Sequence, residues 1–251
     1  MRHDGRQPTE LRPISFETGY IHHHPGSVLV SFGRTKVLVS AISENRVPQH
    51  RLNSGGGWIS AEYSLLPAST AERKQRPSHK GADARGTEIQ RLIGRSLRQA
   101  VDINKIGVKT FHIDCDVIQA DGGTRAAAIT GGYIALVLLV HHLIQTKQLR
   151  KVTANEVLRK PIAAVSLGIL NNEILTDLDY IEDSTADTDF TLVASNDGTL
   201  VEFQGTAENA PMQKEHPALV LEQGMLAIEQ ISKLQEEAIQ KALKQLPEVQ
   251  S

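Results

Sequence analysis

Residues 111–132 read FHIDCDVIQADGGTRAAAITGG, and this stretch decides much of the fold. Its first part alternates apolar and polar residues, as a half-buried strand does, and its alanine-rich second part is typical of a helix. Two glycines, Gly122 and Gly123, separate the two parts. The pattern predicts a β-strand that leads through a tight turn into a helix.

The turn has the composition of an oxyanion site. The first amides of a helix have no partners within the helix, and the helix dipole adds partial positive charge there. The glycines allow a close backbone approach, and Thr124 can cap the helix or donate its hydroxyl. Arg125 adds a planar fork that suits phosphate oxygens. An ordinary turn with a solvated arginine is the alternative, since the stretch has neither Walker A nor G-x-G-x-x-G spacing.

Length, charge and cysteine content limit the class of protein. A chain of 251 residues can form one large domain or two packed halves. Its net charge of −2 means that any site for a polyanion must be local. The single cysteine, Cys115, fits a reducing compartment. We expect a cytoplasmic protein without membrane contact, because no secretion signal begins the sequence and the apolar run 134–140 is short beside the ~20 residues that span a bilayer.

Hydrophobic patterning predicts an α+β fold of two packed halves. Residues 1–150 would form an N-terminal half with a cationic loop and the phosphate turn, and residues 151–251 a C-terminal half with an acidic turn and a terminal helix, together one compact unit. Strands are predicted at 27–32, 37–42 and 111–117, and then at 162–170, 173–179, 190–195 and 199–204. Residues 67–86 are predicted to be a loop and 145–160 a linker or short helix, and helices are predicted at 87–102 and roughly 217–246.

Two charged segments are candidates for binding phosphates or a cation. Arginines and lysines gather in the loop and on the following helix, at positions 73, 74, 76, 80, 85, 91, 95 and 98. They could contact the phosphates of a nucleic-acid backbone or form a solvated face. The acidic segment 182–189 (EDSTADTD) suits magnesium or acid–base chemistry, but an exposed turn has a similar composition. The sequence does not show which of Asp183, Asp187 and Asp189 point inward.

Ordered motifs relate the whole chain to a known family. They are DGR at 4–6, LRP at 11–13, PGSVLV at 25–30, GRTKVLVSA at 33–41, GW and AEY at 57–63, EIQRLIGRSLR at 88–98, DCDVIQADGGTR at 114–125, DLDYIEDS at 177–184 and QGTAE at 204–208. With these motifs the chain resembles the ribonuclease PH family, bacterial phosphate-dependent exoribonucleases that trim the 3′ ends of transfer RNA.

The resemblance implies a ribonuclease PH-like fold of two βαβα-type halves and a homohexameric ring built as a trimer of dimers. It implies that inorganic phosphate is bound by Gly123, Thr124 and Arg125, together with Arg85 in the loop before EIQRLIG. It also implies that Asp183 and Asp189 are catalytic and hold Mg²⁺.

The resemblance further associates Arg73 and Arg76 with RNA binding or subunit contacts. The chain departs from the family at 84–87, where Ala-Arg-Gly-Thr stands in place of Gly-Arg-Thr. The expected activity is reversible phosphorolysis of transfer RNA precursors and other RNAs, which releases nucleoside 5′-diphosphates. A non-catalytic RNA-binding ring subunit and a magnesium-dependent hydrolytic nuclease are the alternatives.

Overall fold

Alternating apolar residues in the first part of the chain build a five-stranded sheet. The computed structural model describes residues 2–76 and 83–245. The strands are β1 (Ile14–Thr18), β2 (Ser27–Phe32), β3 (Thr35–Glu44), β4 (Trp58–Leu65) and β5 (Thr110–Gln119), in the order β1-β2-β3-β5-β4. Among the described strands of this sheet, β4 and β5 alone are paired in parallel. The predicted strands at 27–32 and 37–42 are confirmed as the antiparallel pair β2 and β3, whereas β1, β4 and the 3₁₀ turn η1 (Gln49–Arg51) were not predicted.

Helix α1 (Ala84–Gln99) makes the crossover from β4 to β5 and begins earlier than predicted. The side chain of Asp83 accepts a hydrogen bond from the amide of Gly86 at 3.0 Å and so caps the helix. A side chain at position 86 would collide with this cap, because its Cβ would lie 2.5 Å from Asp83 Oδ2. The prediction of a loop as far as residue 86 was therefore wrong, and Arg85 belongs to the first helical turn.

Helix α2 (Thr124–Gln145) begins directly after the glycine pair, as predicted. It packs against β2 and β3 of the first sheet and against β6 of the second. In the described part of the chain, α2 alone has the length and apolar composition to cross a membrane, and 83% of its apolar window is buried inside the protein. The apolar run 134–140 is therefore part of a longer helix, and the burial of this helix agrees with the prediction that the run belongs to the core.

The second part of the chain forms an antiparallel sheet in the order β7-β6-β8-β9. Its elements are α3 (Ala154–Val157), β6 (Ala163–Leu170), β7 (Glu173–Thr176), α4 (Tyr180–Asp183), β8 (Thr188–Ala194), β9 (Leu200–Ala207) and α5 (His216–Leu243). Strand β7 ends before the predicted residue 179, because Asp177 adopts a left-handed φ of 55° and Asp179 caps α4. The four predicted strands and the terminal helix are otherwise confirmed.

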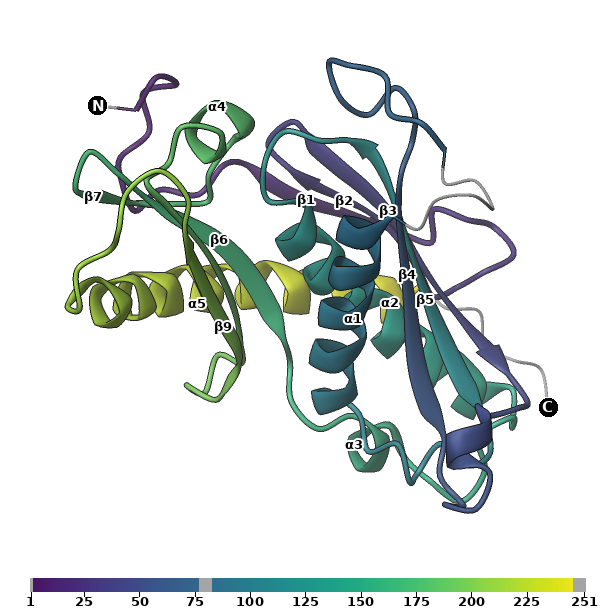
Figure 1. Cartoon of the computed structure of the whole chain (residues 1–251). Helices are drawn as coiled ribbons and strands as arrows, with labels where there is room; N and C mark the ends of the chain where they lie inside the picture. Colours follow the sequence, from purple (N-terminus) through teal and green to yellow (C-terminus); the bar gives the residue numbers. More distant parts are fainter. Residues whose placement is uncertain (1, 77–82, 246–251) are drawn as a thin grey trace.

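The two sheets share one hydrophobic core. Figure 1 shows the sheets side by side, with the long helix α5 running along both of them. Helix α5 packs against β1, α2, β6 and β8. Buried Gln235 of α5 donates hydrogen bonds to the carbonyls of Thr130 and Ile162, at 2.9 and 3.1 Å. The predicted α+β class is confirmed, and the turn before α2 lies against the segment that leads into α4.

Candidate active site

The glycine turn has the geometry that its sequence indicated. Gly122 and Gly123 have φ angles of 75° and 66°, in the left-handed region that glycine tolerates best. A Cβ on Gly122 would lie 2.4 Å from the carbonyl oxygen of Leu178. The turn therefore lies directly against the backbone that leads into α4. The first amides of α2 follow the turn and lie in the same region.

Thr124 is the first residue of α2, but its side chain does not cap the helix, because Gly123 is the N-cap. The hydroxyl of Tyr63 donates to Thr124 Oγ1 at 2.8 Å. Since this hydrogen bond occupies an acceptor position, the Thr124 hydroxyl keeps its own hydrogen for another partner. Burial raises the pKa of the Tyr63 phenol, which keeps it in its donating form.

Two arginines stand at the starts of the two helices. Arg125 is in the first turn of α2, and its guanidinium lies 3.3 Å from the carboxylate of Glu88 on α1. Arg85 is in the first turn of α1 and exposed. Both side chains add positive charge at the starts of their helices, where the helix dipole also favours an anion.

Asp183 and Asp189 reach the same region from the second half of the chain. Asp183 ends α4, and Asp189 lies in β8, a central strand of its sheet. Burial raises the pKa of Asp183. Burial, followed by the negative charge of Asp183, raises the pKa of Asp189 to about 6. At neutral pH a larger fraction of Asp189 is therefore protonated than of an ordinary carboxyl, which suits a general acid.

The predicted ionic groups act on one another electrostatically. The charges of Arg85 and Arg125 lower the pKa values of both Asp183 and Asp189, which opposes the effect of burial. The negative charge of Glu208, which follows β9, raises both. The structure thus brings the two arginines, the turn and the two aspartates together, although they span more than a hundred positions in the sequence.

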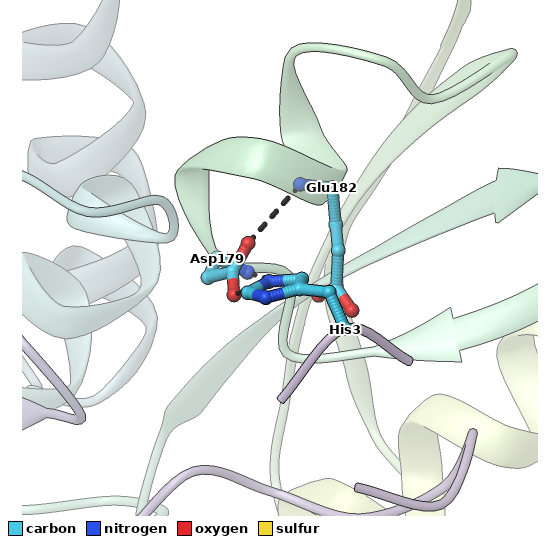
Figure 2. A group of neighbouring side chains, drawn as sticks. All are labelled: His3, Asp179 and Glu182. Carbon is cyan, nitrogen blue, oxygen red and sulfur yellow. Dashed lines mark hydrogen bonds and ion pairs between the residues drawn. The ribbon is translucent and has the colours of Figure 1, made fainter. Parts of the chain in front are cut away.

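A short, well-capped helix fixes the position of Asp183. Figure 2 shows Asp179 at the start of α4 with Glu182 and His3 beside it. Asp179 Oδ1 accepts hydrogen bonds from the amides of Ile181 and Glu182, at 2.9 and 3.1 Å. Asp179 Oδ2 lies 2.5 Å from His3 Nε2. These contacts stabilise a helix of a single turn, which has little stability of its own.

The same group of side chains has ligand atoms close enough together for a metal ion, but its charges suit a different role. Glu182 Oε1 and Oε2 accept hydrogen bonds from Arg2 at 2.7 and 2.5 Å, and Oε2 lies 3.4 Å from Arg6. A cation bound here would be repelled by two buried guanidinium groups. Glu182 is therefore a structural ion-pair partner, and only part of the predicted acidic segment faces the site.

The predicted cationic surface divides into residues with different environments. Arg95 pairs with Glu202 of β9 at 3.1 Å. Arg98 lies 4.4 Å from the ring centre of Trp58 and donates to the carbonyl of Ile59. Two of the arginines on α1 therefore have partners within the protein, and their environments differ. Arg73 and Arg76 are exposed between β4 and α1, and no described contact joins them to the site, whereas Lys80 lies outside the described residues.

Three residues of the site were not predicted, namely Tyr63, Arg12 and Asp177. Tyr63 is in the AEY motif and Arg12 in the LRP motif, so the resemblance contained a signal for both positions but no role. Asp177 was hidden in the expected strand 173–179. Tyr63 is hydrogen-bonded to Thr124, and Arg12 is hydrogen-bonded to Asp177. These contacts join segments that are distant in sequence, and local patterns cannot show such pairing.

Models of two protein domains match this chain. Domain 1 of the 3′ exoribonuclease family matches residues 10–140, and domain 2 matches residues 160–245. The chain belongs to the 3′ exoribonuclease family. The predicted resemblance and fold are thereby confirmed.

Curated relatives and solved structures agree with this membership. Ribonuclease PH of Crocosphaera subtropica is 45% identical over 241 residues, 96% of this chain and 98% of that protein. Ribonuclease PH of Rhodopirellula baltica is 45% identical over 231 residues, 92% and 94% of the two chains.

Two solved structures share the fold at low identity. Rice (Oryza sativa) Rrp46 has a TM-score of 0.75 at 20% identity, covering 95% of this chain and 100% of its own. The Archaeoglobus fulgidus exosome with RNA bound to the active site has a TM-score of 0.78 at 23% identity, covering 94% and 92%.

Proposed function

We propose that this protein is a phosphate-dependent 3′-to-5′ exoribonuclease, which trims the 3′ ends of transfer RNA precursors and other RNAs. One observation carries the proposal. Arg85, Arg125 and the start of α2 lie in the same region as Asp183 and Asp189, two partly buried carboxyls of raised pKa. The first group suits an anionic co-substrate, and the second suits proton transfer and cation binding. Family membership and the ribonuclease PH relatives support the same activity.

In the proposed reaction, inorganic phosphate is held by Arg125, Arg85, the Thr124 hydroxyl and the amides that follow Gly123. An oxygen of this phosphate attacks the phosphorus of the last phosphodiester bond. The bond to the 3′ oxygen of the preceding nucleotide breaks, which releases a nucleoside 5′-diphosphate and leaves an RNA with a free 3′ hydroxyl. Inorganic phosphate and RNA are both anions, and their repulsion opposes the reaction. Fixed positive groups therefore stabilise the transition state most at the phosphate oxygens on which negative charge accumulates.

Asp189 is the proposed general acid. Its pKa of about 6 leaves a fraction of the carboxyl protonated near neutral pH, and the departing 3′ oxygen needs a proton. Asp183 raises this pKa through its own charge. In the reverse reaction Asp189 would take the proton from the 3′ hydroxyl, so the enzyme would also add nucleotides from nucleoside diphosphates.

The two carboxyls also suit a magnesium ion. Burial disfavours their negative charge, and a hard cation with oxygen preference would offset that cost. Asp183 and Asp189 would hold Mg²⁺, which when bound supplies positive charge to balance the phosphate oxygens.

The organisation of the working enzyme is also proposed from the family. We infer a homohexameric ring built as a trimer of dimers, acting in the cytoplasm as a soluble protein. We retain residues 1–150 and 151–251 as the two halves of one compact unit. Exposed Arg73 and Arg76 would contact RNA or a neighbouring subunit of the ring.

The test is product analysis from a transfer RNA precursor with a 3′ extension, incubated with Mg²⁺ with and without inorganic phosphate. Nucleoside diphosphates that form only with phosphate would support phosphorolysis. Nucleoside monophosphates formed without phosphate would support the hydrolytic alternative. A folded protein that binds RNA but releases no nucleotide would support the non-catalytic ring subunit, which the presence of Arg85, Arg125, Asp183 and Asp189 disfavours.

A further inference from the structure

Arg12 is buried between the two parts of the site. On one side it holds Asp177 of the second half. Its Nη2 and Nε donate to Asp177 Oδ1 and Oδ2 at 2.7 and 3.0 Å, and its backbone amide donates to Oδ2 at 2.9 Å. Asp177 lies two residues before the N-cap of α4, so this fork anchors the segment that carries Asp183.

On its other side Arg12 holds the glycine turn. Its Nη1 donates to the carbonyl of Asp121 at 2.5 Å, and its Nη2 lies 3.5 Å from the carbonyl of Gly122. A Cβ on Gly123 would lie 3.0 Å from the same Nη2. The Arg12 guanidinium therefore contacts the backbone directly before α2, which sets the direction of the first amides of that helix. It also binds the carboxylate of Asp177, which anchors the acidic segment.

Thr35 of β3 holds the turn from a second direction. Its buried hydroxyl donates to the carbonyl of Gly122 at 2.6 Å and accepts from the amide of Asp121 at 2.9 Å. The two peptide groups before α2 are thus fixed by side chains from two other segments. Rates of enzymes are sensitive to misplacements of about 1 Å, so groups that hold a binding turn influence catalysis without touching substrate.

We propose that Arg12, supported by Thr35, is a positioning residue that sets the phosphate-binding turn at its distance from Asp183 and Asp189. This inference rests on the proposed function. It predicts that loss of the guanidinium fork weakens phosphate binding specifically, whereas a purely structural role would lower stability and leave the folded protein with normal phosphate affinity.

The first test is Arg12→Lys, which keeps the positive charge but loses the fork. The control is Arg6→Lys. Arg6 is similarly buried in the same ion-pair cluster, and its contacts are to Asp4, Glu10, Asp177 and Glu182, without a described hydrogen bond to the turn. Phosphate affinity is measured from the rise in melting temperature with inorganic phosphate, and the KM for phosphate and kcat from nucleoside diphosphate release.

We expect Arg12→Lys to weaken phosphate affinity by about tenfold or more and to lower kcat, with RNA binding in the absence of phosphate unchanged. Arg6→Lys should lower the melting temperature but keep phosphate affinity within about twofold of the wild type. Equal affinities in Arg12→Lys and wild type, or an equal loss in both variants, would overturn the inference.

A second pair of variants decides the question if Arg12→Lys does not fold. Thr35→Val loses both hydrogen bonds to the turn, and Thr35→Ser keeps them. Weaker phosphate binding in Thr35→Val with rescue in Thr35→Ser would support positioning, and wild-type affinity in Thr35→Val would refute it. Because phosphate binding is measured without turnover, this outcome is separate from the proposed function, which fails if wild-type protein releases no diphosphates with phosphate present.

Discussion

Asp189 carries a charge that the fold disfavours at neutral pH, and replacing it should stabilise the protein. Its pKa rises from 3.8 to about 6, mainly through burial and then through the charge of Asp183. Asp189→Asn keeps the size of the side chain and removes the ionisation. We expect the variant to resist urea better than the wild type at about pH 8 while losing phosphorolysis.

The sign and size of this effect follow from proton linkage. A carboxyl with a raised pKa in the folded state binds its proton more tightly when folded, so its contribution is favourable at low pH and is lost as pH rises through the folded-state value. The wild-type free energy of unfolding should therefore fall between about pH 4 and 6. A pKa change from 3.8 to about 6 corresponds to roughly 3 kcal/mol at higher pH, and residual solvent contact reduces this to about 2 kcal/mol.

The assay is urea unfolding of both proteins at about pH 8 and about pH 4, at one protein concentration, with EDTA and without phosphate. The advantage of Asp189→Asn should be present at the higher pH and absent at the lower. Asp197→Asn is a control of opposite sign, because an ion pair with Lys160 lowers the pKa of exposed Asp197. No advantage for Asp189→Asn at the higher pH, or an equal one at both, would refute the reasoning.

Three further substitutions test the phosphate turn and its surroundings. Arg125→Ala should lower phosphate-dependent turnover by about a hundredfold or more, as for other preorganised charge-stabilising groups, whereas Arg95→Ala, which loses a surface pair, should retain it. Gly122→Ala should cost at least about 2 kcal/mol in urea unfolding and abolish phosphate binding, because its Cβ would collide with Leu178. Tyr63→Phe should lower stability by about 1 kcal/mol through the lost hydrogen bond to Thr124 and raise the KM for phosphate, and an unchanged KM would remove Tyr63 from the site.

Local sequence patterns predicted the turn because its determinants are adjacent in the chain. Gly122 and Gly123 supply the left-handed angles, and the apolar run that follows forms α2. Asp183 and Asp189 came from the family resemblance, since their acidic segment alone did not show which carboxylates point inward. The predicted start of α1 was three residues too late. The Asp83 cap that starts this helix lies in a polar stretch whose composition is typical of a loop.

The remaining parts of the site depend on pairing over long distances. Arg2 and Glu182 are 180 positions apart, and Arg12 and Asp177 are 165 positions apart. Hydrophobic periodicity contains no information about which buried arginine meets which buried carboxylate. The partner of Arg95 was hidden for the same reason, because Glu202 comes from a strand of the other sheet.

Helix α2 packs against elements of both halves, and its residue Thr130 is hydrogen-bonded to the second half. The Thr130 hydroxyl accepts a hydrogen bond from the amide of Ala164 at 3.1 Å, and the Thr130 carbonyl accepts one from Gln235 at 2.9 Å. A chain cut between residues 150 and 151 would expose, in one fragment, the face of α2 that packs against β6 and α5. In the other fragment, the amide of Ala164 and the side chain of Gln235 would lose their hydrogen bonds to Thr130. We therefore expect the two halves to unfold together as one cooperative unit, and not as two autonomous modules.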